Sequence, residues 1–299
     1  MATLYRNKKN FSWKHIDLSF ILVIPAISIL LLVLVLPLFN VIYLSFCRDT
    51  PQGDTIFSGL VNYATIIHDP AFLVVLKNTF IFTFCSVLFH FLLGLSAALL
   101  LNTDIRARKL LRTIALIPWM FPSVVVAITW AWMYHGQFGV FNFILNRLQI
   151  IPSFIPWLAE RRTALAAVIV ASSWRGFPIL MMMFLAGLQS VPKEQYEAAS
   201  VDGATRLQQF RFVTLPNLKP IIAIALALDT IWMFRYFDLV QVMTAGGPGI
   251  ATEVLVTRIY KVSFHYFKFG EASAVAVIMF LILLFFILVY YRVALKRSR

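Results

Sequence analysis

The sequence has little charge, since only 13% of its 299 residues are Asp, Glu, Lys or Arg, about half the share of an ordinary soluble domain. Apolar residues make up 61% of the chain, and a water-soluble fold of this size cannot bury that much apolar surface. This composition excludes a soluble enzyme, a secreted disulfide scaffold and a disordered tail. It predicts an integral membrane protein.

Residues that bind metals and nucleotides are also scarce. The two cysteines, Cys47 and Cys85, are too few for a disulfide framework or a metal site. The five histidines are scattered, and no pair has the spacing of metal or haem ligands. No Gly-Lys-Ser/Thr follows the Gly-Gly-Pro at 246–248, so the sequence lacks a phosphate loop. We therefore expect no metal, cofactor or nucleotide site in this chain.

Six long apolar runs lack the alternation of a β-barrel and predict transmembrane helices. The first run follows a basic N-terminus and is too long for the apolar core of a signal peptide, so we expect it to be retained. The predicted spans are 18–46, 72–101, 112–134, 163–190, 217–243 and 271–292.

Lysine and arginine are unevenly divided between the loops that these spans define. Sixteen of the 26 fall in the N-terminal segment, the loops after the second and fourth spans, and the C-terminal tail. The other loops hold eight, and Arg175 and Arg235 lie inside spans. Because basic loops face the cytoplasm, both termini should be cytoplasmic. The same asymmetry accounts for the net charge of +13 without a nucleic-acid partner.

The predicted cytoplasmic loop 191–216 differs from an ordinary connector. Glu197-Ala198-Ala199 favours a helix, and Gly203 allows a turn or close contact with a partner. A second helical stretch should follow over about 204–213, and Pro216 should close it at the start of the fifth span. We expect a short helix–turn–helix whose small side chains suit insertion into a groove on another protein.

This loop resembles the signature loop of the permease subunits of binding-protein-dependent ABC importers. The resemblance lies in Glu197-Ala198-Ala199, Gly203 and Val213-Thr214-Leu215-Pro216. The segments 174–178 (Trp-Arg-Gly-Phe-Pro) and 237–248, which ends in Thr-Ala-Gly-Gly-Pro, are similar to carbohydrate-uptake permeases of the maltose and glycerol-phosphate type. The likeness covers nearly the whole chain and is strongest over about 72–292. It implies an all-α integral membrane protein with six transmembrane helices and the type I ABC importer permease fold.

The resemblance also implies a role and a set of partners. The chain would import a sugar or sugar-like solute across a bacterial or archaeal cell membrane by alternating access. Its partners would be a second, different permease, an extracytoplasmic solute-binding protein and two cytosolic ATPase subunits, which bind ATP and Mg²⁺. Residues 1–17 would be a cytoplasmic N-terminal segment, 18–71 the first span and outer loop, 72–292 the core permease domain, and 293–299 a basic tail.

In this family the loop docks into a cleft on the ATPase. The resemblance assigns that coupling role to a set of matched positions: Glu197, Ala198, Ala199, Asp202, Gly203, Leu215 and Pro216.

Charged side chains in a bilayer are costly and usually face a cavity. Asp229, Trp232, Met233 and Tyr236 have the i, i+3, i+4, i+7 spacing of one helix face. A carboxylate accepts hydrogen bonds from sugar hydroxyls, and aromatic rings stack on the C–H faces of a sugar. The resemblance to maltose-type permeases assigns solute contacts to these four residues and, on the fourth span, to Ser172, Arg175, Gly176 and Ile179.

Other interpretations stay open at this point. In the first alternative, Asp229 pairs with an arginine and only holds the bundle together. In the second, the solute is anionic or is not a sugar, because Arg175 and Arg235 are available to bind it. A secondary transporter would use Asp229 and Asp238 as ion-coupling sites, but it leaves the Glu-Ala-Ala loop unexplained. A membrane enzyme with a His-bound metal is the remaining alternative.

Overall fold

The computed structural model describes residues 18–50 and 54–295. Within these ranges the chain is helical apart from one antiparallel hairpin. The elements are α1 (Leu18–Leu30), a π-helical turn (Leu31–Val35), α2 (Leu36–Ser45), β1 (Cys47–Asp49), β2 (Thr55–Phe57), α3 (Val61–His68), α4 (Pro70–Leu101), α5 (Arg108–Met120), α6 (Ser123–Met133), α7 (Val140–Arg147), α8 (Ala164–Ser190), α9 (Lys193–Val201), α10 (Arg206–Gln209), a second π-helical turn (Phe210–Thr214), α11 (Leu215–Phe234), α12 (Asp238–Thr244), α13 (Leu255–Phe264) and α14 (Phe269–Leu295).

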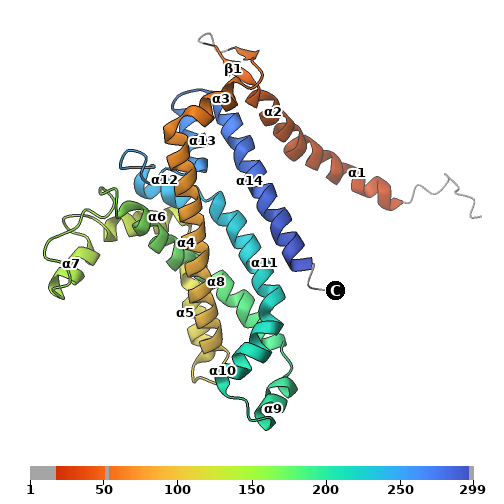
Figure 1. The fold of residues 1–299 in the computed structure, drawn as a ribbon, viewed down its shortest axis with the longest axis vertical. Helices are drawn as coiled ribbons and strands as arrows, with labels where there is room; N and C mark the ends of the chain where they lie inside the picture. Colours follow the sequence, from red (N-terminus) through yellow and green to blue (C-terminus); the bar gives the residue numbers. More distant parts are fainter. Residues whose placement is uncertain (1–17, 51–53, 296–299) are drawn as a thin grey trace, which may run out of the picture.

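The long helices α4, α8, α11 and α14 form the body of the molecule (Figure 1). Helices α4 and α8 approach closely at Gly94, where an added Cβ atom would lie 3.0 Å from the Cβ of Leu180. One apolar cluster, centred on Leu180, Phe184 and Leu218, joins α4, α8 and α11. A second cluster around Phe82 and Leu239 joins α4, α6, α8 and α12. These contacts fix α11 against the two helices that it faces.

Five helical segments are long and apolar enough to cross a membrane: Leu22–Ser45, Pro70–Leu101, Ala164–Ser190, Arg206–Phe234 and Phe269–Tyr290. A sixth passes the same test only if α5 and α6 count together, and these two helices meet at an angle of 91°. The prediction of one continuous helix over 112–134 is therefore wrong. The break lies at Phe121, which is extended because Pro122 follows and disfavours the helical conformation.

The boundaries of the fifth span also differ from the prediction. Pro216 does not close the preceding helix, because one helical run continues from Arg206 to Phe234. The π-helical turn Phe210–Thr214 accommodates the proline: Leu215 donates to the carbonyl of Phe210, five residues back, just before the residue that lacks an N–H. At the other end α11 stops at Phe234, and the short helix α12 begins at Asp238.

The two ends of the bundle differ in structure. Helix α9 and the turn before α10 lie at one end, and the β hairpin with α3 and α13 lies at the other (Figure 1). Helix α14 runs from the hairpin end toward the end that carries α9, whereas α1, which is joined to the hairpin end through α2, points to the side (Figure 1). Helix α1 leaves the bundle, and none of the most apolar stretch of Leu22–Ser45 is buried against the rest of the chain.

Candidate functional site

The loop between α8 and α11 forms the helix–turn–helix expected from the sequence. Glu197 and Ala198 are exposed on α9, and Ala199 is half-buried. Gly203 follows with φ of +77°, a left-handed backbone that glycine adopts without strain. Thr205 then caps α10, exchanging hydrogen bonds with Gln208. The exposed Asp202 lies at the end of α9, and the exposed Leu215 and Pro216 are the first two residues of α11.

Two apolar side chains in this loop were not singled out from the sequence. Val201, at the end of α9, is 88% exposed, and Leu207 in α10 is 76% exposed. The signal was present in the sequence, because both are aliphatic residues in a polar loop that lies outside the predicted spans. They flank the Gly203 turn and extend the small-residue surface of Ala198. Together with Glu197 they make an apolar surface with an acidic group beside it.

Hydrogen bonds fasten α9 to the start of α11. The hydroxyl groups of Tyr196 and Thr214 lie 3.0 Å apart. Asn217 on α11 donates to the side-chain oxygen of Gln195 at 2.9 Å. These two hydrogen bonds join α9 to the helical run that continues as α11, which carries Asp229 near its other end.

A cavity of about 300 Å³ lies at that other end, between α5, α8 and α11. It contains seven of the eight residues that the sequence assigned to solute contact. Its lining consists of Trp119, Arg175, Gly176, Ile179, Asp229, Trp232, Met233, Arg235 and Tyr236. Ser172 is the exception: it is buried behind the lining, and its hydroxyl donates to the sulfur of Met233 at 3.5 Å.

The carboxylate of Asp229 pairs with a histidine and not with an arginine. Asp229 is 2% exposed, and its Oδ2 lies 2.9 Å from Nδ1 of His90, which is fully buried on α4. Nε2 of His90 lies 3.0 Å from the carbonyl oxygen of Ser172 on α8. One imidazole thus links three helices. Sequence patterns could not predict this link, because His90 and Asp229 are 139 residues apart.

Gly176 makes room for that imidazole. A Cβ atom built on Gly176 would collide with Cε1 and Nε2 of His90. The ring therefore lies against bare backbone of α8, in hydrogen-bond range of the Ser172 carbonyl. This close approach explains why position 176 needs a glycine, in addition to its place in the cavity wall.

Tyr236 lines the cavity from the segment after α11, and not from the helix itself. Because α11 ends at Phe234, the prediction that Tyr236 shares a helix face with Asp229 is wrong. The Tyr236 ring stacks on Phe82, with centroids 6.3 Å apart and planes 10° apart. The guanidinium carbon of Arg175 lies 6.0 Å from the centre of the same ring. Tyr236 therefore orders the cavity wall beside Arg175.

Three cavity residues were not assigned to the solute site from the sequence: Trp119, Arg235 and, behind the lining, His90. Trp119 belongs to α5, ahead of the bend at Phe121. Arg235 is the residue after α11, and in the part of the chain that the structure describes it makes no ion pair with Asp238. Asp238 accepts a hydrogen bond from Ser123 instead.

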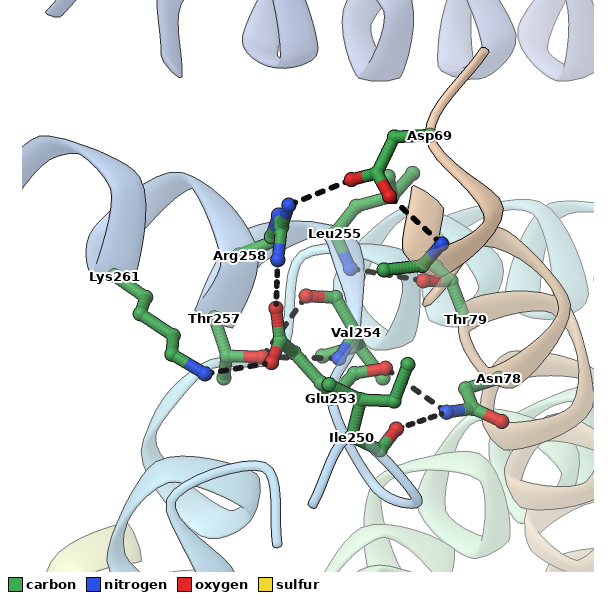
Figure 2. Close-up of polar contacts among 11 residues, drawn as sticks. Asp69, Asn78, Thr79, Ile250, Glu253, Val254, Leu255, Thr257, Arg258 and Lys261 are labelled. Atoms are coloured by element: carbon green, nitrogen blue, oxygen red, sulfur yellow. Dashed lines mark hydrogen bonds and ion pairs between the residues drawn. The ribbon is translucent and has the colours of Figure 1, made fainter. Parts of the chain in front are cut away.

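The hairpin end carries a second polar cluster, away from the cavity (Figure 2). Glu253 is 1% exposed, and its two carboxylate oxygens pair with Arg258 at 3.4 Å and Lys261 at 3.2 Å. Arg258 also pairs with Asp69, the residue that caps α4, at 2.9 Å. The side chain of Asn78 on α4 donates to two backbone carbonyls of the segment before α13. The cluster fixes the loop after α12 to the start of α4.

The turn that the sequence predicted at Gly-Gly-Pro is part of this loop. Ala245 and Gly246 have φ of +48° and +85°, and Thr244 and Thr252 hydrogen-bond across the turn at 2.7 Å. The turn lies at the hairpin end of α4, opposite the loop that carries α9 (Figure 1).

The geometry can be compared with known proteins. Residues 90–299 match the family described as the inner membrane component of binding-protein-dependent transport systems. The chain belongs to this family. It is a multi-pass permease subunit of an ABC importer, working with a solute-binding protein and with separate ATPase subunits that hydrolyse ATP. The permease is therefore not itself an enzyme, and the ion-coupled and metal-enzyme alternatives do not fit this family.

Several permease relatives are similar over most of their length. The chain is 37% identical to the trehalose/maltose transport system permease protein MalF of Thermococcus litoralis, over 94% of this chain and 95% of that one. It is 36% identical to the sulfoquinovosyl glycerol transport system permease protein SmoG of Agrobacterium fabrum, over 92% and 90%. It is 33% identical to the inner membrane ABC transporter permease protein YcjO of Escherichia coli, over 89% and 91%.

Solved structures show the same fold. A bacterial ABC transporter involved in the import of the acidic polysaccharide alginate matches 96% of this permease and 99% of its own chain, with a TM-score of 0.84 and 23% identity. The MetNI methionine ABC transporter matches 76% and 96%, with a TM-score of 0.56 and 19% identity. The predicted fold class, the type I ABC importer permease, is confirmed.

Proposed function

We propose that this permease imports a sugar or sugar-like solute, and that the cavity between α5, α8 and α11 holds it during transport. The observation that carries the proposal is the cavity wall, where Asp229 lies beside Trp232 and Tyr236. This combination offers a hydrogen-bond acceptor for hydroxyls and aromatic faces for the sugar ring. The names of two relatives, for trehalose/maltose and for sulfoquinovosyl glycerol, support the same class of solute.

The proposal includes docking of α9 to the ATPase. Glu197, Ala198 and Ala199 would enter the cleft, with Val201 against its apolar wall and Gly203 providing the turn. Support comes from the exposure of these residues and from the hydrogen bonds that fasten α9 to α11. ATP-driven movement of α9 would then displace α11 and open the cavity to the other side. ATP and Mg²⁺ would bind only to the ATPase subunits, with no cofactor in this chain.

We also propose a second, different permease as the partner within the membrane. The long apolar helix of residues 22–45 supports this pairing, because most of its apolar side chains are exposed and only its α2 end packs against α14. That subunit would complete the cavity between α5, α8 and α11. Both termini would be cytoplasmic, since the basic residues favour that side and since α14 runs from the hairpin end toward the end that carries α9.

The solute role of Asp229 is tested by Asp229→Asn. An asparagine amide can still donate to Nδ1 of His90, so the buried contact between α4 and α11 survives while the carboxylate is lost. We expect the KM for uptake by the assembled importer to rise by about tenfold, with unchanged assembly, because an amide oxygen accepts a hydrogen bond from the solute more weakly than an oxygen of the Asp229–His90 pair. Asp54→Asn, at an exposed position of the outer loop, is the control. Unchanged uptake kinetics in Asp229→Asn would remove Asp229 from the solute site.

A further inference from the structure

Two arginines line the cavity without a carboxylate partner. Within residues 18–50 and 54–295, neither Arg175 nor Arg235 forms an ion pair. Nε of Arg175 is buried and has no hydrogen-bond partner there. A guanidinium group at membrane depth is costly unless an anion or a set of acceptors compensates it. The described residues therefore leave the half-buried Arg175 and the exposed Arg235 of the cavity lining without a negative partner.

Asp229 does not fill that role. The carbonyl oxygen of Ser172 can only accept a hydrogen bond, so Nε2 of His90 must carry the proton of that contact. The contact between Nδ1 of His90 and Oδ2 of Asp229 then requires another proton, shared between the two side chains. Imidazolium with carboxylate and imidazole with carboxylic acid both give a pair with no net charge. The two arginines therefore determine the charge of the cavity.

The other nearby acid, Asp238, forms an ion pair with neither arginine among the described residues. Asp238 is not part of the cavity lining, and its carboxylate accepts a hydrogen bond from Ser123 at the start of α6. Arg235 follows the last residue of α11, where the negative end of the helix dipole compensates part of its charge. Arg175 lies in the middle of α8 and has no such compensation. Arg175 is thus the residue with the strongest need for an anion.

We propose that the solute of this permease carries an acidic group, a carboxylate, sulfonate or phosphate, that Arg175 binds with Arg235 beside it. The planar guanidinium can bind two oxygens of such a group at once, and Tyr236 holds its orientation through the contact at 6.0 Å. Trp119 and Trp232 offer aromatic faces for the rest of the solute. This inference rests on the proposed sugar-import function and narrows the solute to acidic sugars.

The test uses the complete importer, with its own ATPase, second permease and binding protein, in proteoliposomes. The probes are two pairs of compounds that differ mainly in the acidic group: sulfoquinovosyl glycerol against glucosyl glycerol, and a uronic-acid disaccharide against the corresponding neutral disaccharide. ATP-dependent uptake is measured for the wild type, Arg175→Gln, Arg175→Lys and the control Arg147→Gln, whose arginine lies on α7 outside the cavity.

We expect the wild type to take up the acidic member of at least one pair with a KM at least about tenfold below that of its neutral twin. Arg175→Gln should remove that preference, while Arg175→Lys keeps part of it because the positive charge remains. Arg147→Gln should behave as the wild type. If Arg175→Gln does not assemble, the ratio of acidic to neutral uptake in the wild type still decides between the two classes of solute.

Three other results would contradict the inference, each in a different way. Preferred uptake of the neutral twins would overturn the acidic solute and leave the sugar-import function standing. Weaker association of the second permease with Arg175→Gln, with an unchanged ratio of acidic to neutral uptake by the complexes that remain, would show that Arg175 pairs with an acid of that subunit, which also overturns the inference. Uptake of none of the four compounds would overturn the proposed sugar-import function and the inference with it.

Discussion

Gly203→Val is expected to uncouple ATP hydrolysis from transport while the permease still inserts and assembles. Gly203 has φ of +77°, and a β-branched residue is strained there by roughly 1–2 kcal/mol or more. That strain lowers the population of the native turn by about five- to thirtyfold. Because the turn sets the direction of α10 relative to α9, we expect ATP-dependent uptake in proteoliposomes to fall by about tenfold.

Gly203→Asn separates the backbone effect from an effect of bulk. No atom lies within 4 Å of a Cβ built at this position, and asparagine adopts the left-handed conformation far more readily than valine. We therefore expect the asparagine variant to keep most of the uptake. If the valine and asparagine variants reduce uptake equally, position 203 does not require glycine because of its positive φ. Close contact with the ATPase at this position would then be the reason.

Glu253→Ala is expected to be the most destabilising single substitution at the hairpin end. The Glu253 carboxylate is buried and is the shared partner of Arg258 and Lys261 (Figure 2). Without it, two cations remain in a cluster whose other acid is Asp69. Removal of one member of a buried ion-pair network costs roughly 3–5 kcal/mol. Denaturation of the detergent-solubilised permease, followed by circular dichroism, measures this loss directly.

The matched control is Asp104→Asn. Asp104 also forms an ion pair, with Arg108 at 3.4 Å, but its side chain is fully exposed. Exposed pairs of this kind add little to stability, so we expect an unfolding transition like that of the wild type. An equal shift of the unfolding transition in both variants would mean that the Glu253 cluster contributes no more stability than a surface ion pair and does not anchor the loop after α12.

Much of the helical topology could be predicted from apolar runs, because the span of a bilayer fixes the length of an apolar helix. The prediction failed where proline changes the chain direction. Pro122 makes Phe121 extended and bends the third segment, although the apolar run itself is unbroken. Pro216 has the opposite outcome, since a π-helical turn before it lets the helix continue. Hydropathy alone does not distinguish these two prolines.

The cavity, too, could be predicted from the sequence only in part. Spacing on one helix brought Asp229, Trp232 and Met233 together, because i, i+3 and i+4 share a face. The partner of Asp229 could not be found in this way, since His90 reaches it from another helix across the glycine at position 176. Contacts of this kind depend on which helices are neighbours, and that follows from packing and not from local spacing.

The most direct test of the account is purification of the tagged permease from its native membrane, with the co-purifying proteins identified. Wild type is compared with Glu197→Lys, and with Asp104→Lys as a charge reversal in the other loop at the α9 end. We expect an ATPase and a second permease with the wild type and with Asp104→Lys. Glu197→Lys should retain the second permease and lose the ATPase. Equal recovery of the ATPase with Glu197→Lys would contradict docking through α9.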